Sequence, residues 1–451
     1  MWERLAGGHS WSGLLLNRRK DGEVYEESAI ITPVRGDDGA VVAYVATKRD
    51  LSVERGLEED ISRRQSNRDS LVALMNTVRP GESIEATSAA FCDAVTQIDG
   101  MDGAIVFMLQ DDGTVIAASA DPEPMPGFAF GRHIPVPRLQ EIVEETVGGP
   151  WVLDVSASAE HPEMPTDLLD VMRERGIVAA GYAAIRWNEE LVGVVSVATL
   201  RPDGVHWLKS RAGALEEISS FAGAILGRQA LQYRRHETLR REIRDIIDNS
   251  LYHPVFQPVM NLRTNLIGGY EALTRFDDGC APDIRFAEAH SVGLGPDLEA
   301  VCAAVAVETV RHLPVDVWLS INFSADAILD GHAAAVVAKA NRPVVVEITE
   351  HAVIESYPAL RQAITRGGDV LLSVDDAGAG FASLRHILEL DPDIVKLDIG
   401  LIRGIDRDPA RQALVAGMRH FGLKTGTTLI AEGVETAAEA ETVRDLGVEL
   451  G

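Results

Sequence analysis

The second half of the chain, from about residue 248 to the end, alternates short apolar runs with segments of helical spacing. A strand followed by a helix, repeated along the chain, predicts parallel βα units. About 200 residues of this pattern match the size of a small (β/α)8 barrel of the TIM type. The runs that we predict as strands are Leu266–Tyr270, Val317–Ile321, Val344–Val346, Val370–Val374, Ile394–Val395 and Thr428–Ala431.

The beginning of the chain has a different pattern, in which apolar runs are joined by short polar turns. Val24–Val34 and Val41–Thr47 are rich in apolar residues, and the Gly-Asp-Asp-Gly sequence between them is typical of a hairpin turn. Residues 1–54 are therefore predicted to form antiparallel strands. The polar residues 55–70 have a weak apolar stripe and are predicted to be a helical linker.

Residues 71–228 begin and end with helical spacing and carry two predicted β-hairpins in between. This order of elements predicts an α+β domain. The segments are the helical Leu71–Val78 and Ile84–Ile98, the strand pairs Ala104–Leu109 with Val115–Ser119 and Tyr182–Trp187 with Leu191–Leu200, and the amphipathic helix Trp207–Arg234.

That helix is expected to continue through residues 229–247 as a connecting helix rich in both signs of charge. Its apolar residues form a partial heptad seam: Leu231, Leu239, Ile243 and Ile246–Ile247. A parallel coiled coil between two copies of the chain is one hypothesis. A solvated single helix is the alternative.

Composition narrows the class of protein. The 451 residues carry 42 Lys and Arg against 69 Asp and Glu, a formal net charge of −27. This surplus argues against a general binder of duplex nucleic acid, which must displace cations from phosphates. No apolar run approaches the roughly 20 residues that span a bilayer. Cys92, Cys280 and Cys302 are too widely separated to suggest a disulfide framework or a cysteine metal site. We expect a cytoplasmic protein with no membrane segment in this chain.

Each predicted strand in the second half is followed by a polar or charged side chain. These are Glu271, Asn322, Glu347, Asp375 with Asp376, Lys396 and Glu432. The carboxyl ends of barrel strands open on one face, which holds the active site, so these groups should converge there. A single acid after an apolar run is usually an ordinary strand end or helix N-cap. The same feature after every run is not explained in that way.

Several carboxylates on one face repel one another, so a cation must compensate them. An oxygen-rich set without Cys or His suits Mg²⁺ or Mn²⁺ rather than zinc. The adjacent pair Asp375 and Asp376 could bridge two such ions, which would clamp the attacking and leaving oxygens of a phosphodiester. Lys396 could orient the attacking water or help to deprotonate it. The residues alone thus indicate metal-dependent hydrolysis of a phosphoester.

The motifs around these residues resemble those of the EAL domain family, in the family's order, across residues 248–451. They are Glu271-Ala272-Leu273, SINFSA at 320–325, VEITE at 346–350, VDDAGAGFASL at 374–384, VKLD at 395–398 and AEGVET at 431–436. The resemblance implies a TIM-like barrel that hydrolyses cyclic di-GMP to linear pGpG with two Mg²⁺ or Mn²⁺ ions. It also implies a homodimer.

The resemblance assigns metal ligands residue by residue. One metal ion would be held by Glu271, Asn322, Glu347 and Asp375. The second would be held by Asp375 and Asp376.

Other matches concern water, substrate and the loop after Asp376. Lys396 and Glu432 match groups that position and activate the water, and Arg275 matches an arginine that contacts substrate phosphate. Glu350 matches an acid that supports the loop, which in the family couples dimerisation to metal binding. Two further acids of the same motifs, with roles less closely defined, are Asp398 and Glu435.

Two departures from the family pattern bear on activity. The loop usually reads DDFGTG, whereas this chain has Ala377 and Ala379 in place of Phe and Thr. The chain also ends at Gly451, before a Gln-Gly segment that lines the family's site. We interpret the barrel as truncated at its C-terminus, with an incomplete last strand and an exposed edge at its seam.

The two upstream blocks resemble sensory domains. Residues 1–54 resemble the C-terminal part of a PAS domain, and residues 71–228 resemble a GAF domain. The PAS resemblance rests on Trp11–Gly13, NRRKDGE at 17–23, Thr32–Val34 and KRDLS at 48–52, and the GAF resemblance on hairpin order and LVGVVSVATL at 191–200.

No sensory ligand is predicted for these blocks. GAF domains bind cyclic nucleotides, haem or bilins, and many have no known ligand. Cys92 is better explained as a core cysteine than as a bilin attachment site. His133, His161 and His206 are better explained as solvated loop histidines than as haem ligands.

The leading hypothesis is a cyclic di-GMP phosphodiesterase regulated by its PAS and GAF domains. The alternative is a catalytically weak or inactive EAL receptor, which the altered loop favours and the retained ligand set opposes. A scaffold without nucleotide is a third possibility. No GG(D/E)EF motif of a cyclase occurs in the sequence.

Overall fold

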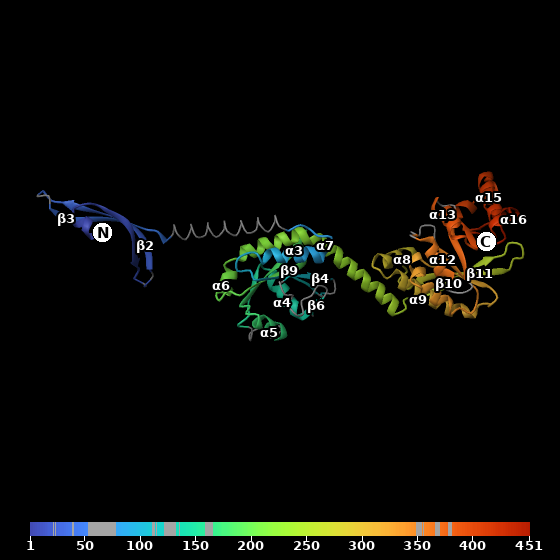
Figure 1. Ribbon diagram of the computed structural model, residues 1–451, viewed down its shortest axis with the longest axis horizontal. Helices are drawn as coiled ribbons and strands as arrows, with labels where there is room; N and C mark the ends of the chain where they lie inside the picture. Colours follow the sequence, from blue (N-terminus) through green and yellow to red (C-terminus); the bar gives the residue numbers. More distant parts are fainter. Residues whose placement is uncertain are drawn as a thin grey trace. The chain divides into compact units, whose positions relative to one another are not determined.

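The computed structural model describes residues 1–20, 22, 24–37, 40–52, 78–110, 113, 115–120, 132–134, 136–157, 166–348, 354, 356–365, 370–377 and 381–451. It divides into two compact units, Met1–Arg234 and Arg235–Gly451, coloured from blue to green and from yellow-green to red in Figure 1. The predicted linker 55–70 lies outside the described residues.

A short helix and a three-stranded antiparallel sheet open the first unit. The elements are α1 (Trp2–Ala6), β1 (Trp11–Arg18), β2 (Val24–Arg35) and β3 (Val41–Asp50), with the strands in that order. Glu27 is buried in β2, and Lys48 of β3 lies 2.6 Å from its carboxylate. The predicted antiparallel strands are confirmed, whereas α1 was not predicted.

The rest of the first unit is built on a six-stranded antiparallel sheet. Its strands are β4 (Gly103–Leu109), β5 (Val115–Ala120), β6 (Arg132–Ile134), β7 (Trp151–Asp154), β8 (Ala179–Trp187) and β9 (Glu190–Thr199), in the order β6-β5-β4-β9-β8-β7. Both predicted hairpins are confirmed. Asn188 and Glu189 join β8 to β9 with positive φ angles of 49° and 68°, as tight hairpins require.

Helices cover both faces of this sheet. They are α3 (Ile84–Val95), α4 (Val136–Thr146), α5 (Thr166–Glu174) and α6 (Gly204–Lys209). Phe91 of α3 and Leu208 of α6 belong to one apolar core, and Ile142 of α4 and Met172 of α5 belong to a second. The sequence pattern did not predict α4 and α5, which are short amphipathic segments among prolines and glycines.

The connecting helix is α7 (Ala212–Asp248), 37 residues long. The predicted start at Trp207 is wrong, because that residue lies in α6, which ends before α7 begins. Ile243 and Ile246 are buried in an apolar core of the second unit, and Leu239 and Ile247 pack against it. Ile243 and Ile246 are therefore not available for a seam between two copies, so the coiled-coil hypothesis is wrong at these two positions.

The second unit contains a seven-stranded sheet in chain order. The strands are β10 (Tyr252–Met260), β11 (Ile267–Phe276), β12 (Trp318–Asn322), β13 (Val344–Ile348), β14 (Val370–Ala377), β15 (Ile394–Leu397) and β16 (Thr428–Ala431). The predicted strands are confirmed as parallel neighbours, β11 to β16. The antiparallel β10 was missed because Pro254 and Pro258 argue against an interior strand.

Helices follow the parallel strands and cover the outer face of the sheet. They are α8 (Pro282–Ser291), α9 (Gly295–Thr309), α10 (Ala325–Leu329), α11 (His332–Val337), α12 (Tyr357–Thr365), α13 (Phe381–Leu390), α14 (Ile399–Ile402), α15 (Pro409–Thr425) and α16 (Ala437–Asp445), with 3-10 turns η2 (Val310–His312) and η3 (Ile405–Arg407). Outward-facing strand residues such as Ile321, Val346 and Val374 share one core with these helices.

The last residues of the chain join the two edges of this sheet. Leu450 bridges Ile430 of β16 in parallel and Asn261, just after β10, in antiparallel fashion. Gly451 and Met260 exchange two backbone hydrogen bonds of 2.8 and 3.0 Å. Leu450 and Gly451 therefore bridge the seam at this point, where an exposed edge was expected.

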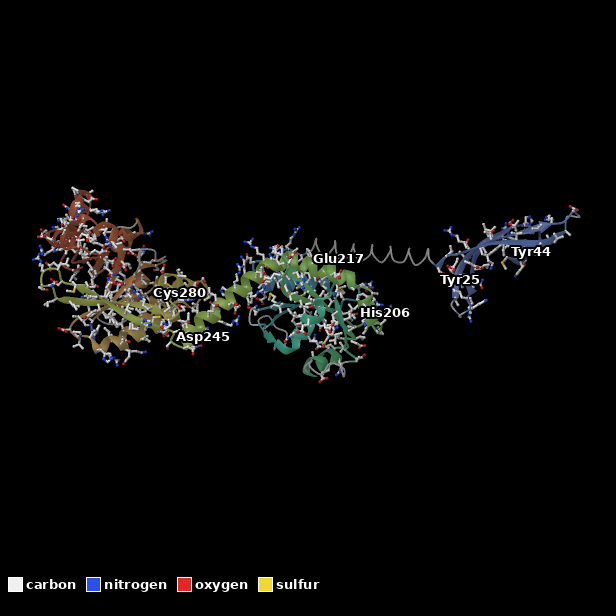
Figure 2. All side chains as sticks on the ribbon, turned by 180° about the vertical axis from the view of Figure 1, so that it is seen from behind. Tyr25, Tyr44, His206, Glu217, Asp245 and Cys280 are labelled. Carbon is white, nitrogen blue, oxygen red and sulfur yellow. The ribbon has the colours of Figure 1, made fainter. Side chains whose placement is uncertain are left out.

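The structure bears on two expectations from composition. All three cysteines are free thiols: Cys92 and Cys302 are buried, and Cys280 (labelled in Figure 2) is partly exposed. Within the described ranges, no helix has the length and apolar character needed to cross a membrane.

Candidate metal and active site

Side chains alternate in direction along a strand, and this alternation points the predicted site residues of β13 and β15 to the same side of the sheet. In β13, Val345 and Glu347 are two residues apart and so point to the same side. In β15, the same spacing relates Ile394 to Lys396. Val345 and Ile394 belong to one small buried apolar cluster. Glu347 and Lys396 therefore lie over this cluster, one layer nearer the carboxyl ends of the strands.

Lys396 is the centre of the acidic cluster. Its side chain is 3% exposed. Its Nζ lies 2.7 Å from Oε1 of Glu432, and 3.2 Å from one oxygen each of Glu271, Glu347 and Asp375. Four carboxylates thus meet around one buried ammonium.

Asn322 completes the set on the side of β12. Its Nδ2 donates a hydrogen bond to Oε1 of Glu271 over 3.3 Å, and its backbone lies in register with Glu347 of β13. Because the nitrogen of the amide faces Glu271, Oδ1 is the atom that can serve as a metal ligand.

Asp375 and Asp376 reach the same site through a β-bulge. Consecutive residues of a regular strand point to opposite sides. Here the register with β15 shifts between Val374 and Ala377, and Asp376 has a φ of 52°. Aspartate tolerates this left-handed conformation better than most residues. The bulge turns both carboxylates towards the cluster.

The carboxylates form two groups that fit divalent cations. The first is Glu271, Glu347 and Asp375, and the second is Asp375, Asp376 and Glu432; within each group the ligand oxygens lie within 4.8 Å of one another. Asp375 belongs to both groups. An all-oxygen donor set bridged by one carboxylate suits a pair of hard ions such as Mg²⁺ or Mn²⁺.

The pKa shifts in the acidic cluster show that it would be stabilised by additional positive charge. Burial raises the pKa of Glu347 to about 8 against the opposing charge of Lys396, and Glu271 and Asp375 add to the increase. Burial also raises the pKa of Glu432 to about 7, again with Lys396 opposing. Burial alone would lower the pKa of Lys396, but its acidic neighbours raise it above the ordinary value. One ammonium does not balance the cluster, so cations would stabilise it.

Arg275 lies at the exposed end of β11, beside a cavity of about 430 Å³. Its Nη1 donates to the carbonyl of Thr274 over 2.7 Å. Asn322 and Phe286 line the same cavity. The predicted substrate arginine and one predicted metal ligand therefore border one hollow.

Two predicted acids lie away from this cluster. Asp398 caps the N-terminus of α14 with its side chain. Glu435 is exposed and forms an ion pair with Arg403. Glu350 and residues 378–380 of the altered loop lie outside the described residues.

The structure places three of the residues of the first unit that were considered as cofactor sites. Cys92 is completely buried in the core, as expected. His206 is exposed but lies in α6 rather than a loop (Figure 2), and His133 lies in β6. His161 is outside the described residues.

Sequence reasoning missed Glu439, which orders the loop carrying Glu432. Its Oε1 accepts the backbone N–H of Gly404 over 2.8 Å, and its Oε2 accepts those of Glu435 and Thr436 over 3.0 Å. The hydrogen bond from Gly404, followed by that from Glu435, lowers the pKa of Glu439 to about 2. A Thr-x-x-Glu capping box was visible in the sequence and could have identified it.

Residues 239–451 match the family described as EAL domain. The probable cyclic di-GMP phosphodiesterase PdeN of Escherichia coli K12 is 27% identical over 224 residues, which cover 46% of this chain and 43% of PdeN. Cyclic di-GMP phosphodiesterase PdeL of the same organism is 26% identical over 219 residues, covering 45% of this chain and 60% of PdeL. Residues 239–451 thus match the EAL domain family, and proteins described as cyclic di-GMP phosphodiesterases are similar to this part of the chain.

A solved structure is also similar to this part of the chain. The cyclic-di-GMP-bound form of a standalone versatile EAL protein from Vibrio cholerae O395 is 27% identical and has a TM-score of 0.39, covering 44% of this chain and 88% of that protein. The chain spans less than two thirds of the length of the curated relatives named above.

Proposed function

We propose that this chain is a metal-dependent phosphodiesterase that hydrolyses cyclic di-GMP to linear pGpG on a TIM-like barrel. The observation that carries the proposal is the pair of carboxylate groups sharing Asp375 around the buried ammonium of Lys396. We infer the substrate from the similar proteins that are described as cyclic di-GMP phosphodiesterases.

The two carboxylate groups would each hold one divalent cation, and Asn322 would add its amide oxygen to the first. Bound Mg²⁺ or Mn²⁺ would supply Lewis-acid polarisation of the phosphodiester and activation of the attacking water. Asp375 would bridge the ions, because it belongs to both groups.

Lys396 has the role of a fixed cation and hydrogen-bond donor. The acids around it raise its pKa, in spite of its burial, so it stays protonated. A protonated amine can orient a water molecule but cannot take a proton from it. Glu432 has a pKa of about 7 for its carboxyl group, mainly because of burial, and is the better acceptor for a proton near neutral pH.

Arg275 and the neighbouring cavity would receive part of the substrate. A guanidinium fork at the end of β11 suits a phosphate oxygen. The apolar cavity wall, which includes Leu273 and Phe286, suits an aromatic base beside it.

The first unit would regulate this activity. We propose that residues 1–54 are the C-terminal part of a PAS domain and residues 71–228 a GAF domain. The separate sheets of these two segments support two domains. We also propose a cytoplasmic homodimer.

Turnover of cyclic di-GMP, followed by chromatography of the product, tests the proposal. The chain should yield linear pGpG with Mg²⁺ or Mn²⁺, and Asp375→Asn should abolish the product. The matched control is Asp391→Asn at an exposed aspartate outside the cluster. Nucleotide binding without any product would instead support a receptor.

A further inference from the structure

A buried carboxylate from α9 holds the turn that follows β12. Glu299 is 8% exposed. Its Oε2 accepts hydrogen bonds from the backbone N–H and the hydroxyl of Ser324, over 2.8 and 2.9 Å. Its Oε1 lies 2.6 Å from Nε2 of His290 on α8. Both oxygens of the carboxylate are therefore engaged.

Ser324 is two residues after Asn322, the candidate metal ligand. Its hydroxyl oxygen accepts the N–H of Ala327 and so caps α10. Between the two, the N–H of Phe323 donates to the carbonyl of Glu347 over 3.0 Å. The short segment that carries Asn322 is thus tied to β13 on one side and to Glu299 on the other.

Packing holds this turn on one side only, where Phe323 and Ala325 are buried in the apolar core. Asn322, Ser324, Glu299 and His290 all line the cavity of about 430 Å³. Side chains that border open space are not held in place by close-packed neighbours. Directional hydrogen bonds to a buried charge are the stronger constraint there, since they are roughly twice as strong as neutral ones.

We propose that Glu299 is a positioning residue for the metal site: through Ser324 it fixes the turn that aims the amide oxygen of Asn322 at the first divalent cation. This inference rests on the proposed function and deepens it. His290 assists by holding the second oxygen of Glu299, an arrangement that locks the carboxylate between two helices and the turn.

The electrostatics of the pair agree with this geometry. The hydrogen bond to Glu299 raises the pKa of His290 above its ordinary value, and burial opposes the increase less strongly. A hydrogen bond between an imidazolium and a carboxylate is charge-assisted, so a proton held by His290 strengthens its contact with Glu299.

Binding of Mn²⁺ to the full chain without nucleotide, measured by calorimetry, tests the role. Outer-shell groups of this kind typically change metal affinity by about 10- to 100-fold when removed. We expect that loss for Glu299→Ala, and a smaller one for Glu299→Gln and Ser324→Ala, which each keep part of the hydrogen bonding. Glu308→Gln is the matched control, because Glu308 lies on the same helix and is exposed beside Arg311.

The thermal midpoint and the kinetic constants of each variant distinguish a role of Glu299 in positioning the metal ligand from a role in stability alone. If both Glu299 variants bind Mn²⁺ as the unaltered chain does, while only the thermal midpoint falls, the positioning role is wrong. If the unaltered chain binds Mn²⁺ but releases no pGpG, the proposed hydrolysis fails, and the Mn²⁺ comparison still decides the role of Glu299. If it binds no Mn²⁺, both proposals are overturned.

Discussion

The backbone N–H of Asp376 donates a hydrogen bond to Oδ1 of the preceding residue, Asp375, over 2.9 Å. This contact closes the β-bulge at the end of β14 and gives two consecutive carboxylates access to one site. The left-handed φ of 52° at Asp376 is the local strain that accompanies it.

Asp376→Asn should remove one metal ion without disturbing the bulge. Asparagine also tolerates the left-handed backbone, so the fold should persist while the second carboxylate group loses a charged ligand. Calorimetric titration with Mn²⁺ should show the stoichiometry falling from two ions to one, with hydrolysis strongly reduced. Asp391→Asn, at another aspartate with positive φ (49°), should retain both ions. Unchanged stoichiometry in Asp376→Asn would remove Asp376 from the ligand set.

Lys396→Met should destabilise the chain when chelator is present. Removing one partner of a buried ion cluster leaves uncompensated charge, which typically costs roughly 3–5 kcal/mol. Scanning calorimetry should show a lower transition for the second unit, and Mg²⁺ should restore more stability to the variant than to the unaltered chain. Lys339→Met, at an exposed lysine, is the control. Equal stability of the two variants would argue against Lys396 as the counter-ion of the cluster.

Stability in chelator should fall as pH rises towards 8. Burial raises the pKa of Glu347 to about 8 and that of Glu432 to about 7. A carboxyl group with a raised pKa contributes its full stabilisation below its ordinary value near 4.5 and loses it as pH rises through the folded value. Thermal midpoints between pH 5 and 8 should therefore decline in EDTA and decline less in Mg²⁺. A flat profile in EDTA would contradict the raised values.

Glu439→Gln should weaken the chain above pH 4.5 and have little effect near pH 2. Hydrogen bonds from Gly404, Glu435 and Thr436 lower its pKa to about 2, so its contribution is present above the ordinary value and is lost as pH falls. Thr436→Ala, which removes the other half of the capping box, should cost about 1 kcal/mol. Glu441→Gln, at an exposed position of the same helix, is the control. Identical acid profiles for Glu439→Gln and Glu441→Gln would exclude this role for Glu439.

Much of the site follows from a periodic pattern. Parallel strands share one carboxyl edge, so a polar residue after each apolar run was enough to place Glu347, Lys396 and Glu432 together. The same logic could not find β10, because its prolines conceal a strand whose antiparallel pairing with β11 appears only in the folded chain.

Other features depend on contacts that no local pattern reveals. The bulge at Asp375 and Asp376 arises from register with β15, which appears only when the strands pair. Glu299 lies 25 residues before Ser324, and nothing in its helix distinguishes it from any other acid near a helix start. The apolar spacing around Ile243 does not distinguish between two kinds of packing. It fits a coiled-coil seam between two chains as well as the core within one chain, where the structure places Ile243.

Lys396 gives the acidic cluster a counter-charge that belongs to the polypeptide itself. The strand ends can therefore assemble before any ion arrives, in contrast to small zinc domains, in which binding and folding are one event. If the proposed metal site holds, its occupancy would vary with the supply of free divalent ions while the architecture stays intact. The catalytic rate would therefore depend reversibly on the concentration of divalent ions, whereas the folded state would not.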